Sequence, residues 1–192
     1  VNDATTVNVT ATAVTQITGS ASDLASVYGG GITGLGNENV TVNNADVTAA
    51  HLNTINAGTS VNVVATAVTN ITGSKTELAT TYGGGMTGLG NETITVSDAN
   101  ITSTEANTID GYTTGAVTAT ISTTAIADLD DLTGTGNAYT ITVATADVTA
   151  AALKAVNDAT TVTVTATAVT AITGSASDLD SIYTSGVSGL GN

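Results

Sequence analysis

Apolar and polar residues alternate with a period of two in several stretches of the chain. Val, Ala or Ile alternates with Thr, Ser or Asn in residues 7–12, 117–122 and 162–168. A period of two in β-branched residues is typical of a strand with one buried and one exposed face. The sequence therefore predicts short strands, each with an outward row of threonines.

A different pattern follows two of these strands. Asp46 and Asp147 each precede the sequence Val-Thr-Ala-Ala-x-Leu, whose apolar residues fall near one face of a helix. Aspartate is a common N-cap, and Gly58 is suited to end the first of these segments. Ser22-Asp23-Leu24 has the features of a similar helix start. Threonine and asparagine are mediocre helix formers, so we expect helices of only one or two turns.

The chain is built from internal repeats. Residues Val7–Ser20 return almost unchanged at Val61–Ser74 and again at Val162–Ser175. Val1–Asn37 also aligns without a gap to Val156–Asn192, 155 positions later. We divide the chain into seven repeats that start near Val7, Val40, Val61, Ile94, Val117, Tyr139 and Val162. Residues 1–192 are then expected to be one segment, cut from a longer array with a 155-residue super-repeat.

A strand, a short crossover and another strand of the same phase suit parallel pairing. We therefore predict a β-rich repeat protein, a parallel β-solenoid with short helical crossovers and one strand per repeat of 21–33 residues. A string of immunoglobulin-like sandwiches is less consistent with the sequence, because such domains usually bury an aromatic residue and this chain has neither Trp nor Phe.

Composition excludes several functions. Two basic and 16 acidic residues give a net charge of −14, so nucleic-acid binding is not expected. The chain has no Cys, which excludes disulfides and thiol chemistry. No apolar run approaches the length of a membrane span, so we expect no membrane insertion. His51 is the only histidine, and the matching positions of other repeats hold Glu105 and Ala152. We predict that the protein is not an enzyme, with no catalytic residue and no bound cofactor.

Some of the repeated segments resemble a known class of protein. They are Ile17–Leu24 and its copy Ile172–Leu179, Gly31–Asn37, and Leu52–Asn56. These segments resemble the Thr-, Val- and Ala-rich tandem repeats of very large secreted or surface proteins of marine cyanobacteria. The resemblance implies an extracellular or cell-surface location and a structural, adhesive or motility-related role. It supplies no catalytic residues.

Two binding functions remain as alternatives. Asp128, Asp130 and Asp131 are close in sequence and are the candidate calcium ligands of an adhesin, although the glycine-rich loop of calcium-binding β-rolls is absent. The outward threonines could instead form a flat ice-binding ladder. Their rows are Thr10/Thr12, Thr118/Thr120, Thr140/Thr142 and Thr163/Thr165/Thr167.

The preferred function is mechanical. We expect a structural segment of an extracellular or cell-surface fibre, filament or matrix. The expected partner is a second copy of the chain, joined head to tail, because unpaired strand edges template the addition of another strand.

Overall fold

The computed structural model describes residues 5–191, so the outermost residues of the super-repeat, 1–4 and 192, lie outside it. The helices in this part of the chain are α1 (Ala21–Gly29), α2 (Ala49–Gly58), α3 (Lys75–Gly83), α4 (Ser103–Asp110), α5 (Ile126–Leu129), α6 (Ala150–Asp158) and α7 (Ala176–Thr184). The strands are β1 (Gln16–Gly19), β2 (Asn39–Val42), β3 (Asp46–Thr48), β4 (Asn70–Gly73), β5 (Thr93–Val96), β6 (Val117–Thr120), β7 (Ala138–Thr140), β8 (Asp147–Thr149), β9 (Val164–Thr165), β10 (Ala171–Thr173) and β11 (Val187–Ser188).

The predicted β-solenoid is wrong, because the chain is a mixed α/β protein. Helices hold more of the described residues than strands do, and the strands form short parallel sheets. The segments expected as brief crossovers are full helices, and α2 has 10 residues, close to three turns. The rule of one strand per repeat also fails, since the repeat that starts near Val40 contains β3 as well as most of β2.

Hydroxyl side chains begin the helices. Ser20 accepts a hydrogen bond from the backbone N–H of Asp23, and Thr48 accepts one from His51. The same contact starts α3, α4, α6 and α7, where the capping residues are Ser74, Thr102, Thr149 and Ser175. The predicted N-caps Asp46 and Asp147 are wrong, since both lie in strands two residues earlier. Thr48 and Thr149, two residues after these aspartates, are the caps. Their backbone is extended, and the side-chain oxygen accepts a hydrogen bond from the backbone N–H three residues later.

The alternating stretches are interrupted by turns. In residues 7–12 the described backbone forms one isolated bridge, from Thr10 to Thr33, and the regular strand starts only at Gln16. The N–H of Val14 bonds the carbonyl of Ala11 at 3.1 Å, and equivalent turns close at Val68 and Val169. Only the predicted strand at residues 117–122 forms largely as expected, as β6.

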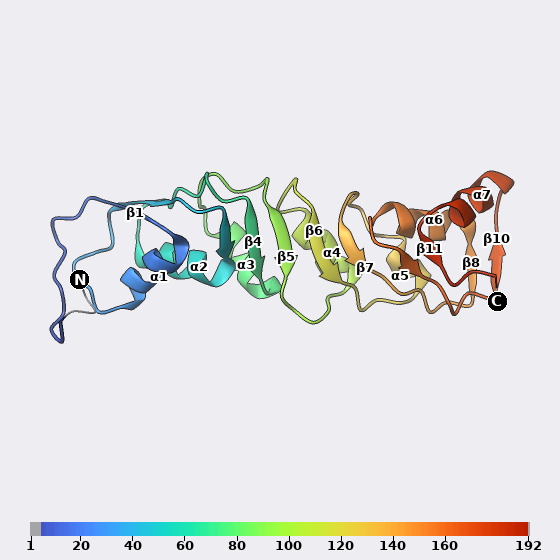
Figure 1. Ribbon diagram of the computed structural model, residues 1–192, viewed down its shortest axis with the longest axis horizontal. Coiled ribbons are helices and arrows are strands. Elements are labelled where there is room, and N and C mark those ends of the chain that lie inside the picture. The colour runs from blue at the N-terminus through green and yellow to red at the C-terminus, as the bar shows by residue number, and fades with distance from the viewer. Residues whose placement is uncertain (1–4, 192) are drawn as a thin grey trace. The chain divides into compact units, whose positions relative to one another are not determined.

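The described residues divide into two compact units. Unit 1 runs to Thr95 and includes Thr113–Gly115. In it β1 pairs with β2, while β3, β4 and β5 are neighbours in that order, and the pairings β1–β2 and β3–β4 are parallel. Helix α1 packs against α2, as Figure 1 shows, and α2 packs against α3. The core between helices and strands is aliphatic and includes Leu24, Leu52, Ile55, Ile71, Leu78 and Ile94.

Unit 2 comprises Val96–Tyr112 and the chain from Ala116 onward. Its parallel pairs are β6 with β7, β8 with β10, and β9 with β11. Helix α5 packs against α6, and α6 packs against α7. The core contains the aliphatic residues Ile101, Ile109, Leu129, Ile141 and Leu153 and one large aromatic residue, Tyr139.

Candidate functional site

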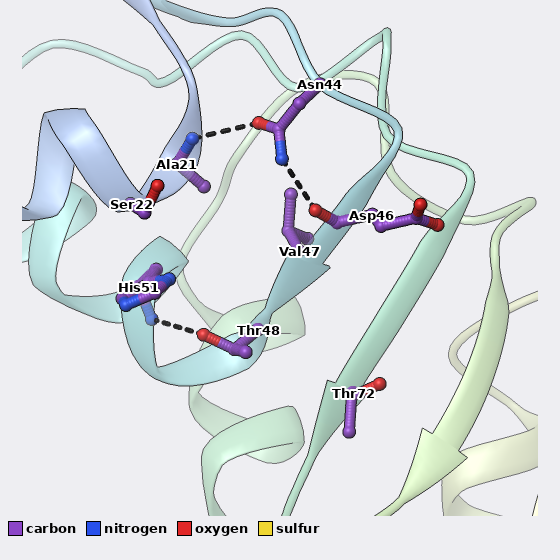
Figure 2. Close-up of a pocket in the computed structure, with 8 residues that line it drawn as sticks. All are labelled: Ala21, Ser22, Asn44, Asp46, Val47, Thr48, His51 and Thr72. Atoms are coloured by element: carbon purple, nitrogen blue, oxygen red, sulfur yellow. Dashed lines mark hydrogen bonds between the residues drawn. The ribbon is translucent and has the colours of Figure 1, made fainter.

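The only histidine lies beside a shallow groove in unit 1. The groove has a volume of about 320 Å³ and is lined by Ala21, Ser22, Asn44, Asp46, Val47, Thr48, His51 and Thr72. Figure 2 shows that the hydrogen bonds drawn there join the side chains of Asn44 and Thr48 to backbone groups. Asn44 accepts from the N–H of Ala21 at 2.8 Å and donates to the carbonyl of Asp46 at 2.6 Å.

His51 is the third residue of α2, where its backbone N–H bonds Thr48 Oγ1 at 3.2 Å. Glu105 and Ala152 occupy the same position in α4 and α6. Within residues 5–191, no hydroxyl is hydrogen-bonded to the imidazole of His51, so the groove lacks the nucleophile–base pair that covalent catalysis uses. The histidine therefore stands at a helix-start position that tolerates several side chains.

The three calcium candidates face different grooves. Asp128 and Asp131 line a groove of about 280 Å³ next to the start of α4. Asp130 lines another groove, of about 570 Å³, together with Asp147 on β8. Among the described residues no group of three or more His, Cys, Asp or Glu side chains is arranged to hold a metal ion.

Two buried glutamates form contacts that the sequence analysis missed. Glu38 and Glu92 are fully buried, and each accepts a hydrogen bond from a tyrosine hydroxyl ten residues earlier, Tyr28 or Tyr82. The Tyr82–Glu92 bond is 2.6 Å long. The signal was present in the sequence, since both glycine-rich loops begin with Tyr and are followed by Glu at the same spacing. We call these two contacts the Tyr–Glu clasps.

Backbone groups complete each clasp. The N–H of Gly36 bonds Glu38 at 2.7 Å, and the N–H of Gly90 bonds Glu92 at 2.7 Å. Burial by itself would raise the pKa of Glu38, but hydrogen bonds from Tyr28 and from the backbone outweigh it and hold the pKa below its usual value. Burial, followed by the contact with Glu38, raises the pKa of Tyr28. Each clasp therefore ties the glutamate that follows a glycine-rich loop to both the tyrosine before the loop and the loop's own backbone.

Unit 2 contains a related but incomplete cluster. Asn137 is buried, donates to Asp110 at 2.7 Å and accepts from the N–H of Val117 at 2.7 Å. Beside it the hydroxyl of Tyr139 is buried and has no hydrogen-bond partner among the described residues. Burial, followed by the charge of Asp110, raises the pKa of Tyr139.

Serine and threonine hydroxyls link backbone segments that are 24 or 21 residues apart in the sequence. Ser60 Oγ donates to the carbonyl of Gly36 at 2.9 Å, and Thr161 Oγ1 donates to that of Asn137 at 3.0 Å, each across 24 residues. The same bond across the same 24 residues joins Thr33 to Val9, Thr87 to Val63, Thr93 to Thr69, Thr114 to Gly90, Thr170 to Ala146 and Ser188 to Val164. A second series, across 21 residues, joins Thr59 to Glu38, Thr113 to Glu92, Ser122 to Ile101 and Thr160 to Tyr139. We call these bonds the hydroxyl cross-links.

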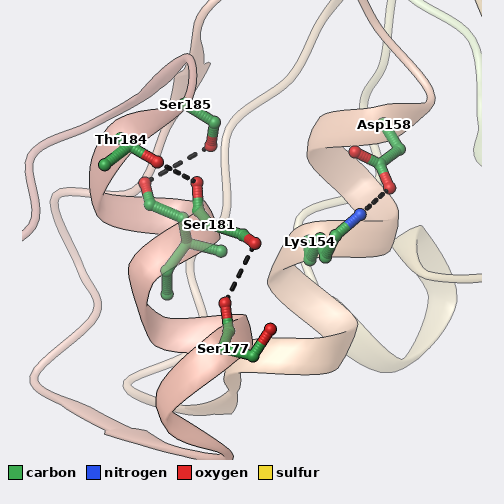
Figure 3. A network of polar contacts seen from close by, with 7 residues as sticks. Lys154, Asp158, Ser177, Ser181, Thr184 and Ser185 are labelled. Atoms are coloured by element: carbon green, nitrogen blue, oxygen red, sulfur yellow. Dashed lines mark hydrogen bonds and ion pairs between the residues drawn. The ribbon is translucent and has the colours of Figure 1, made fainter.

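The polar network on α6 and α7 is local to each helix. Figure 3 shows the ion pair between Lys154 and Asp158 on α6 and a set of hydroxyl contacts on α7. Ser181 Oγ donates to the carbonyl of Ser177 at 3.0 Å, one turn earlier. These contacts satisfy exposed side chains and bring no reactive groups together.

Comparison of the chain with protein-family models, curated proteins and solved structures finds no match. Among residues 5–191, none of the helices has both the length and the apolar character needed to cross a membrane.

Proposed function

We propose that this chain is a non-catalytic structural segment of an extracellular or cell-surface fibre or matrix. The observation that carries the proposal is the series of hydroxyl cross-links. Twelve Ser or Thr side chains among the described residues donate to a backbone carbonyl 24 or 21 residues earlier. These Ser and Thr hydroxyls are engaged in holding the chain together.

The cross-links add to the parallel backbone pairing. A typical intramolecular hydrogen bond contributes about 0.5–1.5 kcal/mol, so each cross-link makes a small contribution of its own. A chain with few charged residues and an aliphatic core gains resistance to unfolding from these polar links without needing disulfides.

The proposed partner is a second copy of the chain. Within the described residues β1 pairs only with β2 and β10 only with β8, which leaves one edge of each strand for further pairing. Open edges with unpaired N–H and C=O groups accept an added parallel strand. The extracellular or cell-surface location is supported by the resemblance of the repeated segments to secreted repeat proteins of marine cyanobacteria.

Immunogold electron microscopy of the producing cells tests the location and the role. Antibodies against this segment are expected to decorate fibres or a sheath outside the cell envelope. Label confined to the cell interior, or label outside the cell that is not associated with any fibre or layer, would contradict the proposal.

Force spectroscopy tests the cross-links themselves. Ser60→Ala, Thr114→Val and Thr161→Val together remove three cross-links at equivalent places, and the unfolding force is expected to fall. The control is Thr118→Val and Thr142→Val, which replaces exposed threonines whose side chains make no hydrogen bond within the described part of the chain. Equal unfolding forces for the two variants would show that the hydroxyl cross-links bear no load.

A further inference from the structure

In unit 2, outward hydroxyls on β6, on the segment from β7 to Thr142 and on residues 163–165 lie in register. Thr120 on β6 lies directly opposite Thr140 on β7, and Thr142 lies opposite Thr165. The bridge from Asn137 to Thr160 has the same sequence offset as the bridge from Thr142 to Thr165, so Thr163 lies opposite Thr140. We call Thr118, Thr120, Thr140, Thr142, Thr163 and Thr165 the hydroxyl array.

The array is open to solvent. All of its members are exposed except Thr165, which is half-buried, and Ala119, Ile141 and Val164 between them are buried. Its side chains make no hydrogen bond within residues 5–191. The threonines of the array therefore differ from those of the hydroxyl cross-links, whose hydroxyls already donate to backbone carbonyls.

The array is also uncharged, in a chain with a net charge of −14. The matching outward positions of unit 1 differ in this respect. There Asp46 accepts a hydrogen bond from Asn70, which in turn accepts one from Thr93. That row is charged at one end and bonded within itself, whereas every member of the array is neutral and its hydroxyl makes no hydrogen bond within the described residues.

We propose that the hydroxyl array is an ice-binding surface. Parallel strands set the array's spacing at about 4.8 Å between strands and about 6.6 Å between alternate residues along a strand. A target that meets such a surface at every point must itself be periodic and uncharged, and must both donate and accept hydrogen bonds, and a crystal of water has these properties. β-Branched threonines on paired strands are stiff, so little conformational entropy is lost when they hold ordered water.

This activity is separate from the structural role, because it needs the outward face alone. The experiment measures thermal hysteresis and ice recrystallisation with the whole chain. The parent protein is expected to shape ice crystals and to depress the freezing point below the melting point. Thr140→Lys with Thr142→Lys, at the centre of the array, is expected to abolish the hysteresis. Thr140→Val with Thr142→Val keeps the side-chain shape and is expected to weaken it.

The matched control is Thr72→Lys with Thr95→Lys, two exposed outward threonines of unit 1. It introduces the same charge and is expected to keep the parent's hysteresis, while circular dichroism confirms that each variant is folded. Absence of hysteresis in the parent, or an equal loss in the array and control variants, would overturn the proposal. Binding of the array to a crystalline polysaccharide without any effect on ice would overturn it as well.

Discussion

At the scale of single residues, the buried hydroxyl of Tyr139 is costly to the fold. It has no hydrogen-bond partner in the described part of the chain, and an unsatisfied buried polar group carries its full desolvation cost. Tyr139→Phe is therefore expected to leave the free energy of unfolding unchanged or to raise it by up to about 1 kcal/mol. Urea denaturation measures the change.

Tyr82→Phe is the matched control for that prediction. It removes the hydroxyl that donates to the buried carboxylate of Glu92 and is expected to lower the free energy of unfolding by about 1–3 kcal/mol. If Tyr139→Phe lowers the free energy of unfolding as much as Tyr82→Phe does, the hydroxyl of Tyr139 must have a hydrogen-bond partner in solution.

The clasp at Glu38 makes stability depend on pH. The pKa of Glu38 is lower in the folded chain than its ordinary value of 4.5. Its contribution to stability is therefore fully present above pH 4.5 and is lost as the pH falls through the lower folded value. Glu38→Gln should be destabilising at neutral pH, and its difference from the parent should shrink below pH 4.5. Denaturation curves recorded from pH 7 to pH 3 measure it, with the exposed Asp180→Asn as the control. A difference that stays constant down to pH 3 would contradict the proposed clasp.

At the scale of elements, the loops after α1 and α3 depend on glycine. Gly88 has φ of 90°, and an added Cβ would lie 2.5 Å from Thr66 Cγ2 and 2.8 Å from Thr66 N. Gly88→Ala therefore combines left-handed strain of about 1–2 kcal/mol with a clash against backbone. We expect a loss of stability larger than the strain alone, measured as a lower melting temperature.

Two other glycines separate these effects. Gly85 also has a positive φ, of 73°, but an added Cβ would meet nothing within 4 Å, so Gly85→Ala should cost the strain only. Gly83 ends α3 with no neighbour within 4 Å and no positive φ, so Gly83→Ala should be neutral or slightly stabilising. Equal effects at Gly85 and Gly88 would show that the contact with Thr66 relaxes at little cost.

At the scale of the whole molecule, we expect folding to be independent of calcium. Calcium takes six to eight oxygen ligands, while Asp130 faces a different groove from Asp128 and Asp131. Melting curves recorded with EDTA and with millimolar calcium are therefore expected to have the same midpoint. A large rise with calcium, removed by Asp128→Asn, would revive the calcium-dependent adhesin as the function.

The sequence alone was sufficient for the local features that rest on neighbouring residues. Its repeats were visible by direct alignment, and each of the seven contains one of the helices in residues 5–191. Gly58 ends α2 as predicted, and β6 lies in the alternating stretch that predicted a strand. Predictions of this kind succeed because apolar periodicity acts over a few residues.

Only the tertiary structure decided which hydroxyls are structural and which are free. Thr161 and Thr163 lie two residues apart, yet Thr161 donates to a carbonyl 24 residues earlier while the side chain of Thr163 is exposed and makes no hydrogen bond within the described residues. The balance of helix and strand was also undetermined, because capping threonines and turns at Val14, Val68 and Val169 interrupt the period-two pattern. These outcomes depend on which segments of the chain pair with one another. Such long-range pairing cannot be read from the local pattern of residues.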